Sequence, residues 1–211
     1  TIMPFEIERK FLPKDTNWRP TGPCHVLRQG FFWLDEDSRG EVICGNERGL
    51  FRLTPRGQSK SFEFVLPEAD ALALGGLTTP HFSKHWYARI RESDGARYRL
   101  TLKGPSADHA QHIRPEFEYD ISAEEGHALL ALCAENHILK RRYPIPYQGY
   151  TWEIDVFDGP HTGLVLCEVE MQSADENPPR PDFIGREVTS EKAYRNVTLA
   201  RSRKLPEISC A

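Results

Sequence analysis

Hydrophobic and polar residues alternate along most of the chain with the two-residue period of a β-strand. In the first such segment Glu6, Glu8 and Lys10 fall on one face, and Ile7 and Phe11 fall on the other. The pattern predicts ten short strands, at 5–12, 25–34, 49–53, 61–66, 85–91, 96–103, 113–121, 139–143, 151–157 and 163–171. Many short strands at close spacing, with few helices between them, indicate an antiparallel barrel or sandwich.

Two helices are expected among these strands. Ser122 and Glu125 form a capping box, and the apolar positions that follow continue the helix to about His137. A second helix is expected from Ser190, an N-cap residue, through Tyr194 to about Leu199. The expected fold class is therefore mainly β, of the α+β type, with a few flanking helices.

The stretch 35–80 differs from the rest of the chain because it is rich in turn residues such as Gly40, Gly57 and Pro67. It is interpreted as an inserted hairpin with its own short helix near 69–74. The 211 residues fit one domain. We expect this domain at 3–200, with the insertion inside it and a tail at 201–211.

Composition narrows the range of functions. There are 27 Lys and Arg against 31 Asp and Glu, a net charge of −4, which argues against nucleic-acid binding driven by overall charge. No apolar run reaches the length of a transmembrane helix, so no membrane partner is expected. The five cysteines include no C-x-x-C pair, and their odd number favours a reducing cytoplasmic location over a disulfide framework or a zinc ribbon.

Full charges dominate the polar faces of the predicted strands, and they form like-signed pairs two residues apart. Glu-x-Glu occurs three times and Arg-x-Arg twice. An ordinary half-buried sheet with its charges in water is the simplest interpretation of the alternation alone. The pairs argue against it, because like charges repel unless a counter-charged ligand lies between them. Beyond the first strand, these faces carry Arg89, Arg91, Arg97, Arg99, Lys103, Arg114, Glu116, Glu118, Lys140, Arg142, Glu153, Asp155, Glu168 and Glu170.

Carboxylates and cations gathered on one surface suit a particular kind of ligand. Carboxylate oxygens are the ligands that Mg²⁺ and Mn²⁺ prefer. Arginine binds phosphate oxygens as a two-pronged fork, and lysine binds them as a point charge. A surface that carries both is compatible with a metal-bound polyphosphate.

An ordered set of motifs gives this surface a resemblance to a known family. The motifs are Glu6-x-Glu8-x-Lys10, Leu27–Phe31, Arg89-x-Arg91, Leu100–Gly104, Arg114-x-Glu116-x-Glu118, Lys140-x-Arg142-Tyr143, Trp152–Phe157, Cys167–Glu170, and Gly185–Thr189 with Tyr194 and Asn196. In this order, over about 5–199, the sequence resembles the CYTH superfamily, also called the triphosphate tunnel metalloenzymes. One E-x-E-x-K motif is weakly specific, whereas the ordered set is strongly specific.

The resemblance implies an eight-stranded antiparallel closed β-barrel, a tunnel, with charged residues inside and helices outside. Burying so many charges is costly unless they are paired or ligand-bound. By this resemblance, one or two divalent cations, Mg²⁺ or Mn²⁺, would be held by Glu6, Glu8, Glu116, Glu118, Asp155, Glu168 and Glu170. The triphosphate would be bound by Lys10, Arg89, Arg91, Lys103, Arg114, Lys140 and Arg142.

The implied reaction is attack of water on a terminal phosphorus, with pyrophosphate leaving. The candidate catalytic residues are Lys10, Glu116, Glu118 and Lys140, with Glu116 or Glu118 as the proton acceptor. The leading hypothesis is an inorganic triphosphatase acting on tripolyphosphate. The alternatives are a class IV adenylyl cyclase acting on ATP, a hydrolase of thiamine triphosphate or another organic triphosphate, and a polyphosphate-binding module without turnover. The expected partner is a small-molecule triphosphate, and a homodimer stays open.

The insertion at 35–80 makes the chain longer than the family pattern requires. A surface insertion without a function is the favoured interpretation, because such insertions cost little stability. The alternatives are a cover for one mouth of the tunnel, an oligomer contact, and recognition of an organic group on the substrate.

Two further patterns are weak. Residues 35–40 begin like a calcium loop, but Arg39 and Asn46 occupy positions where oxygen ligands are needed, so an acidic turn is expected. The pairs His81/His85 and His109/His112 have no zinc-binding motif around them. They are expected to be solvated loop histidines.

Overall fold

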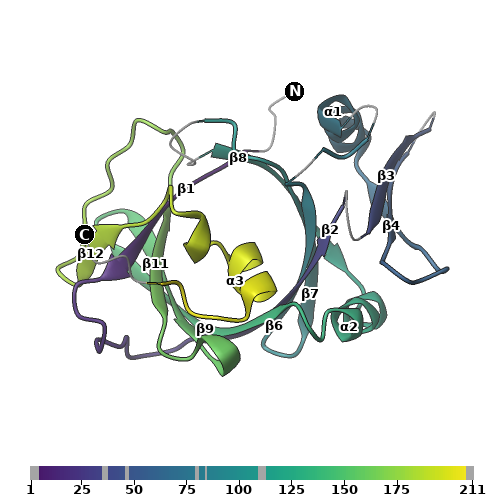
Figure 1. The fold of residues 1–211 in the computed structure, drawn as a ribbon. Coiled ribbons are helices and arrows are strands. Elements are labelled where there is room, and N and C mark those ends of the chain that lie inside the picture. The colour runs from purple at the N-terminus through teal and green to yellow at the C-terminus, as the bar shows by residue number, and fades with distance from the viewer. Residues whose placement is uncertain are drawn as a thin grey trace.

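Eight antiparallel strands close into a barrel in the computed structural model, which describes residues 5–34, 38–45, 48–78, 81–83, 85–108 and 113–207. The hydrogen-bonded order is β11-β10-β9-β2-β6-β7-β8-β1, and β1 pairs with β11 to close the ring (Figure 1). The predicted closed barrel is therefore confirmed. Its strands are β1 (Phe5–Pro13), β2 (His25–Trp33), β6 (Tyr87–Ser93), β7 (Arg97–Lys103), β8 (Ile113–Ile121), β9 (His137–Tyr147), β10 (Tyr150–Phe157) and β11 (Val165–Glu170).

Charged side chains point into the barrel, and the apolar core lies around it. On β6, Arg89 and Arg91 line the interior cavity, whereas Ala88 and Ile90 are fully buried on the outer face. This inverts the arrangement of an ordinary half-buried sheet. The outer face is covered partly by α2 (Ala123–Leu132), whose Leu129 and Leu130 belong to the same core cluster as Ile90.

Gly30 explains one break in the alternation of β2. A Cβ atom at this position would lie 2.6 Å from Cys133 Cβ, so only glycine allows α2 and the residue after it to pack this closely. The capping box predicted for α2 is confirmed, because Glu125 N donates to Ser122 Oγ and Ser122 N donates to Glu125. The helix ends at Leu132 rather than near His137, because His137 already begins β9 and pairs with Gly30.

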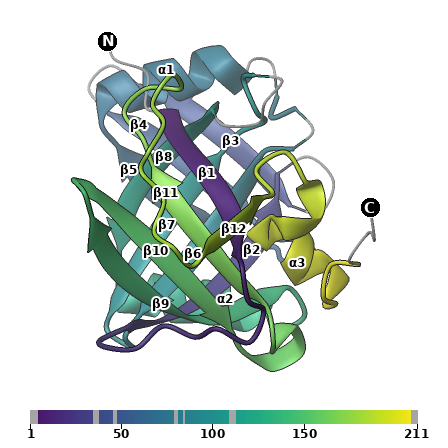
Figure 2. The same ribbon diagram turned by 90° about the vertical axis from the view of Figure 1, so that its left-hand side faces the viewer.

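The C-terminal segment closes one end of the barrel. It comprises η2 (Lys192–Tyr194) and α3 (Asn196–Ser202), and it lies across the opening when the barrel is viewed end-on (Figure 1) and at one end when viewed from the side (Figure 2). Tyr194 and Leu199 pack there against Phe31, Ile138 and neighbouring apolar side chains. A continuous helix from Ser190 was predicted. That prediction is wrong, because Arg195 has extended dihedral angles and separates η2 from α3.

Besides α2, short or irregular segments also pack around the barrel. The strand β12 (Ile184–Glu187) pairs with the end of β1 outside the closed ring, and Ile184 packs in one cluster with Phe11 and Trp152. The turn η1 (Gly159–His161) follows β10, and His161 donates from Nε2 to the Leu199 carbonyl at 2.8 Å. The sequence did not predict β12, since four residues are too short to show an alternation.

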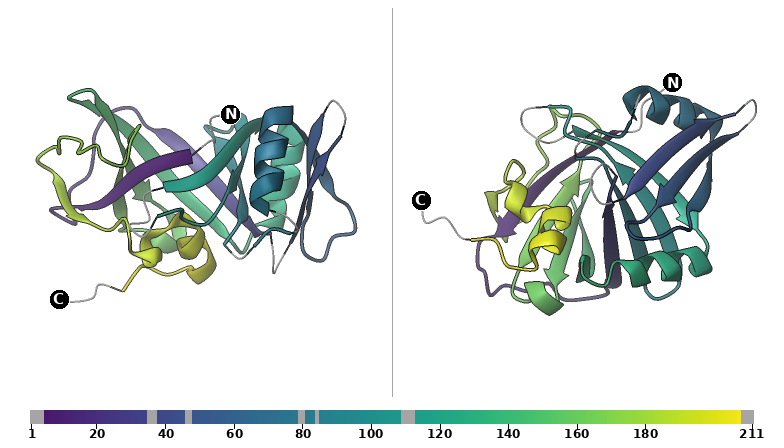
Figure 3. Two further views of the ribbon diagram at one scale, coloured as in Figure 1. Left: turned by 90° about the horizontal axis from the view of Figure 1, so that it is seen from above. Right: turned by 45° about the vertical axis from the view of Figure 1, so that its right-hand side comes forward.

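The insertion forms a three-stranded antiparallel sheet and a helix beside the barrel wall (Figure 3). Its elements are β3 (Arg39–Cys44), β4 (Gly49–Thr54), β5 (Phe62–Leu66) and α1 (Glu68–Thr78). A hairpin with a helix was predicted. The structure contains a further strand, β3, which was not predicted because its run of Val42, Ile43 and Cys44 lacks strand alternation. Tyr119 of β8 donates to Asp70 of α1 at 2.9 Å and ties the insertion to the barrel.

No helix within the described ranges is long and apolar enough to cross a bilayer. The residues 35–37 and Asn46, to which the acidic-turn prediction refers, lie outside the described part of the chain.

Candidate active site

The barrel encloses a polar cavity of about 320 Å³, here called the central cavity, to which all eight barrel strands contribute. Every predicted site residue except Lys140 and Asp155 lines it. Its charged lining residues are Glu6, Glu8, Lys10, Arg89, Arg91, Arg99, Lys103, Arg114, Glu116, Glu118, Arg142, Glu153, Glu168, Glu170 and Arg195. The closed barrel therefore brings together residues of the predicted charged faces that are up to 164 positions apart, from Glu6 to Glu170.

Carboxylates accumulate on β1 and β11 without full compensation. Glu8 and Glu170 are direct cross-strand partners, an arrangement that repels when both are charged. Partial desolvation at the cavity wall, reinforced by the charges of Glu153 and Glu8, raises the pKa of Glu170, although its side chain is exposed towards the vestibule. Burial and the charge of Glu8 raise the pKa of Glu6 to about 8, although Lys103 opposes the shift. A divalent cation among these oxygens would relieve this repulsion, so the residues present fit a hard metal ion.

The residues suit a metal ion in their charge and ligand type, but they do not form a complete coordination shell. Within the described residues, no group of three or more Asp, Glu, His or Cys is arranged tightly enough to hold a metal ion as it stands. Mg²⁺ keeps several of its waters and binds proteins through one or two carboxylates, so a preformed protein cage is not required.

Cations are also in excess on β6. Burial and the nearby charge of Arg89 lower the pKa of Arg91 to about 10, and Arg142 and Arg99 add to the repulsion. Glu118 partly offsets this charge: it accepts from Arg89 and Arg99 at 3.0 Å each and from Arg91 at 3.4 Å. Guanidinium groups gathered in this way match the several oxygens of a polyphosphate.

Other charges in the cavity are closely paired. Lys10 Nζ lies 2.8 Å from Glu168, and Lys103 Nζ lies 2.9 Å from Glu116 and also contacts Glu6. Burial alone would raise the pKa of Glu116, but Lys103 and Arg89 lower it to about 2. In the metal-free tunnel Glu116 is thus a weak proton acceptor, which argues against one of the two predicted candidates.

Lys140 and Asp155 form a fully buried ion pair beneath the cavity lining. Arg142 donates to both oxygens of Asp155 at 2.7 Å and to Glu168 at 2.8 Å. Burial outweighs the charge of Asp155 and lowers the pKa of Lys140. The structure does not bring these two residues to the cavity, and instead they fix the position of Arg142. Their assignments as triphosphate and metal ligands stay predictions.

The predicted site residues leave out several charged or polar groups that the structure places in the cavity wall, among them Arg99 of β7. Glu153 belongs to the charged stripe of β10 and was visible in the alternation. Arg195 and Asn196 enter from the segment between η2 and α3, which has no strand period. No local signal marks them, because their position depends on how the C-terminus folds back over the barrel.

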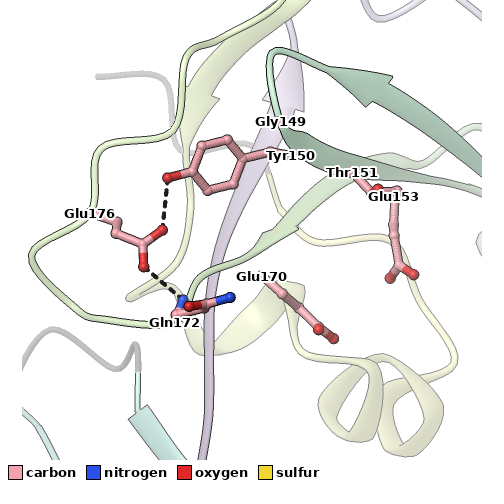
Figure 4. A pocket seen from close by; sticks show the side chains of 7 residues that line it. All are labelled: Gly149, Tyr150, Thr151, Glu153, Glu170, Gln172 and Glu176. Atoms are coloured by element: carbon pink, nitrogen blue, oxygen red, sulfur yellow. Dashed lines mark hydrogen bonds between the residues drawn. The ribbon is translucent and has the colours of Figure 1, made fainter.

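Two further cavities adjoin the central one at opposite ends. The acidic vestibule, about 540 Å³, shares Glu153 and Glu170 with the central cavity and reaches the β9–β10 turn and the loop after β11 (Figure 4). There Glu176 accepts from Tyr150 Oη at 2.7 Å and from Gln172 N at 2.9 Å. The rear chamber, about 380 Å³, lies at α3 and shares Tyr87, Arg114 and Arg195 with the central cavity.

The remaining sequence signals lie away from this site or outside the described residues. His81 lines a surface pocket beside the insertion, and His85 lines the rear chamber. His109 and His112 lie outside the described ranges. None of the described insertion residues lines the central cavity, the vestibule or the rear chamber, and the insertion stands beside the wall rather than over an opening (Figure 1). The structure gives no support to a cover for the tunnel mouth.

The fold and its interior define a class of β-barrel proteins with a charged tunnel. The model of the CYTH domain family matches residues 77–202, more than half of the chain. The chain therefore belongs to the CYTH domain family.

Two curated relatives and one solved structure support this assignment. The inorganic triphosphatase of Acetivibrio thermocellus is 38% identical over 122 residues, which are 57% of this chain and 76% of that protein. The inorganic triphosphatase of Nitrosomonas europaea is 35% identical over 138 residues, 64% of this chain and 86% of that protein. The crystal structure of the hypothetical protein NE1496 has a TM-score of 0.50 and 27% identity, and the alignment covers 95% of this chain and 99% of that chain.

Proposed function

We propose that the protein hydrolyses inorganic tripolyphosphate to pyrophosphate and orthophosphate with the help of Mg²⁺ or Mn²⁺. The observation that carries the proposal is that one enclosed cavity holds an excess of carboxylates on β1 and β11 and an excess of guanidinium groups on β6. A metal-bound triphosphate would neutralise both. The two relatives named as inorganic triphosphatases point to the same substrate.

Glu6, Glu8 and Glu170 would hold the cation, with Glu116, Glu118 and Glu168 within the same cavity. Asp155, the remaining candidate ligand, would act through Arg142, since the cavity lining does not include it. A bound cation lowers the pKa of an attacking water and neutralises charge that develops on phosphate oxygens.

The chain's own contribution is positioning and charge neutralisation. Arg89 and Arg91 would bind the terminal phosphoryl oxygens as forks, and Lys10 and Lys103 would add point charges from β1 and β7. Arg114 and Arg142 complete the cationic lining. Because Asp155 and Glu168 hold Arg142, its guanidinium is oriented before the substrate binds. The proton acceptor stays a prediction, because Glu116 is paired with Lys103 and Glu118 accepts hydrogen bonds from three arginines.

Parallel assays test the substrate and the metal together. The protein is incubated with tripolyphosphate, ATP or thiamine triphosphate, each with Mg²⁺, Mn²⁺ or EDTA. We expect metal-dependent orthophosphate release from tripolyphosphate that EDTA abolishes. Cyclic AMP formed from ATP, or faster turnover of thiamine triphosphate, would replace the proposed substrate. Tight binding of tripolyphosphate without turnover in any combination would exclude the enzymatic function. The cytoplasmic location expected from the cysteines stays a prediction.

A further inference from the structure

Gln29 of β2 is a polar residue buried inside the barrel. It is 1% exposed, and its amide oxygen Oε1 has no hydrogen-bond partner among the described residues. In the sheet register it lies directly opposite Arg91 of β6 on one side and Ile138 of β9 on the other. Directly paired residues point to the same face of a sheet, and Arg91 lines the central cavity. Gln29 therefore lies on the tunnel face of β2, although it does not itself line the cavity.

Arg91 carries an unpaired group that complements this oxygen. Its Nε is also buried without a hydrogen-bond partner in the described part of the chain. Its guanidinium donates instead from Nη2 to Glu118, at the long distance of 3.4 Å. Buried polar atoms nearly always have a partner in folded proteins, so an unpaired donor and an unpaired acceptor on two directly opposed residues need an explanation.

The charges around Gln29 make its neutral amide informative. On the two strands that pair with β2, the nearest charged residues of the tunnel face are Arg89, Arg91 and Lys140, and all three are cationic. A carboxylate at position 29 would pair with Arg91 and neutralise the charge that an anionic ligand needs. An amide oxygen accepts a hydrogen bond from the guanidinium and leaves its positive charge available.

We propose that Gln29 is a positioning residue, whose amide oxygen accepts from Arg91 Nε when the guanidinium turns from Glu118 to a phosphoryl group of the substrate. The turn replaces one long contact by charge-assisted bonds from the two Nη atoms to phosphoryl oxygens, and it leaves the Nε–H for Gln29. Gln29 acts through Arg91 and does not touch the substrate. The inference rests on the proposed function, because the phosphoryl group is that of tripolyphosphate.

The other arginine of β6 is held differently. Arg89 donates from Nη2 to Thr101 at 2.9 Å and to Glu118 at 3.0 Å, which are shorter contacts than the one made by Arg91. Its Nε is also unpaired among the described residues, but the residue opposite it is Phe31, whose side chain has no acceptor atom. Of the two guanidinium groups, only that of Arg91 has both a weak existing contact and a free acceptor across the strand pair.

The kinetics of tripolyphosphate turnover test the positioning role. Gln29→Met keeps the length of the side chain and removes the acceptor. We expect kcat to fall at least about tenfold and KM to change less than about threefold, because the orientation of Arg91 matters most when charge develops in the transition state. Leu27→Met is the matched control, because Leu27 is a buried residue of the same tunnel face and loses no polar atom. It should keep the turnover of the wild type.

A second background shows whether Gln29 acts through Arg91. Arg91→Lys keeps the charge and removes the Nε–H donor. In this background Gln29→Met should lower kcat by less than about twofold, because two residues that act through one hydrogen bond are not additive. The proposal is overturned if Gln29→Met, folded by circular dichroism, has the kcat of the wild type. It is also overturned if the loss is the same in both backgrounds.

Calorimetry on the full chain separates this inference from the proposed hydrolysis. Tripolyphosphate is titrated into metal-free protein in EDTA. Gln29→Glu should weaken binding at least about tenfold, because its carboxylate competes with phosphate for Arg91, whereas Gln29→Met should stay within about threefold of the wild type. Equal affinity of Gln29→Glu and the wild type contradicts the positioning role. Binding with the expected pattern but without turnover would remove the proposed hydrolysis and keep the role of Gln29 in holding Arg91. Absence of both binding and turnover would overturn both.

Discussion

Two groups of charges inside the same barrel differ in how they are balanced. At the cavity wall, Arg142 and Glu168 form a connected set with the buried pair Lys140 and Asp155 behind them, and opposite charges are in contact throughout. At the vestibule end, Glu8 and Glu170 face each other across paired strands and share the same sign. Balanced charges hold the structure in position, whereas like charges held together by a fold store repulsion that a ligand can relieve. The comparison distinguishes residues that hold the site in position from residues whose charge is balanced only when a ligand binds.

The largest expected effect is on the balanced group. Lys140→Met leaves Asp155 fully buried with one partner fewer, and loss of one member of a buried pair costs about 3–5 kcal/mol of unfolding free energy. Urea denaturation of the metal-free protein measures this loss. The double variant Lys140→Met/Asp155→Leu should recover part of it, since no unpaired charge is left. If Lys140→Met is as stable as the wild type, the pair does not stabilise the fold.

Substitution of a vestibule carboxylate should have the opposite pattern of effects, with a small change in stability and a large loss of turnover. Glu170→Gln removes one of two facing charges at an exposed position, so the unfolding free energy should change by no more than about 0.5 kcal/mol. Metal-dependent tripolyphosphate turnover should fall at least about 100-fold, because charge stabilisation in the transition state is lost. Glu176→Gln is the matched control, since Glu176 lies in the vestibule but outside the central cavity. Full turnover by Glu170→Gln would place the metal elsewhere.

The pH dependence of stability sharpens the same contrast. The pKa of Glu6 is raised to about 8 from 4.5 in the folded chain, so the folded protein binds more protons than the unfolded one between these values. Stability of the metal-free protein should therefore fall as the pH rises through this range. Glu168 behaves oppositely: although burial opposes it, Lys10 holds its pKa well below 4.5, and its contribution is lost only as the pH falls below that value.

Urea denaturation in EDTA between pH 6.5 and pH 8 isolates the Glu6 contribution only as the difference between the wild type and Glu6→Gln, because the pKa of Glu170 is raised as well. Below this range His161 also titrates, because burial lowers its pKa from 6.5 and stability falls as it becomes protonated. Glu6→Gln should reduce the loss of stability between pH 6.5 and 8, and Mn²⁺ should do the same for the wild type by favouring the ionised carboxylate. A wild-type stability that rises over this range would contradict the assigned shift.

Much of this organisation was predictable because strand alternation is local. The stripe from Glu6 to Lys10, and its counterparts on β6, β8 and β11, placed these charges on one face, and the family resemblance implied that this face lines a tunnel. The depth of a residue along the tunnel was not predictable. Lys140 and Arg142 share one stripe, yet only Arg142 reaches the cavity. Depth depends on the tilt of the strands and on what fills the barrel end, both of which are set by contacts distant in sequence. Arg195 was missed for the same reason.

The smallest effect on turnover is expected for a contact outside the tunnel, which sets the baseline for the other variants. Tyr119→Phe removes the hydrogen bond to the Asp70 carboxylate and should lower the unfolding free energy by about 1.5 kcal/mol, the lower end for a bond to a charged group, because both residues are partly exposed. Turnover of tripolyphosphate should not change, because no described residue of the insertion lines the tunnel cavities. The measurement pairs urea denaturation with a phosphate-release assay on the same sample. A loss of turnover larger than the loss of folded protein would show that the insertion acts on the site through β8, which carries both Tyr119 and Glu118.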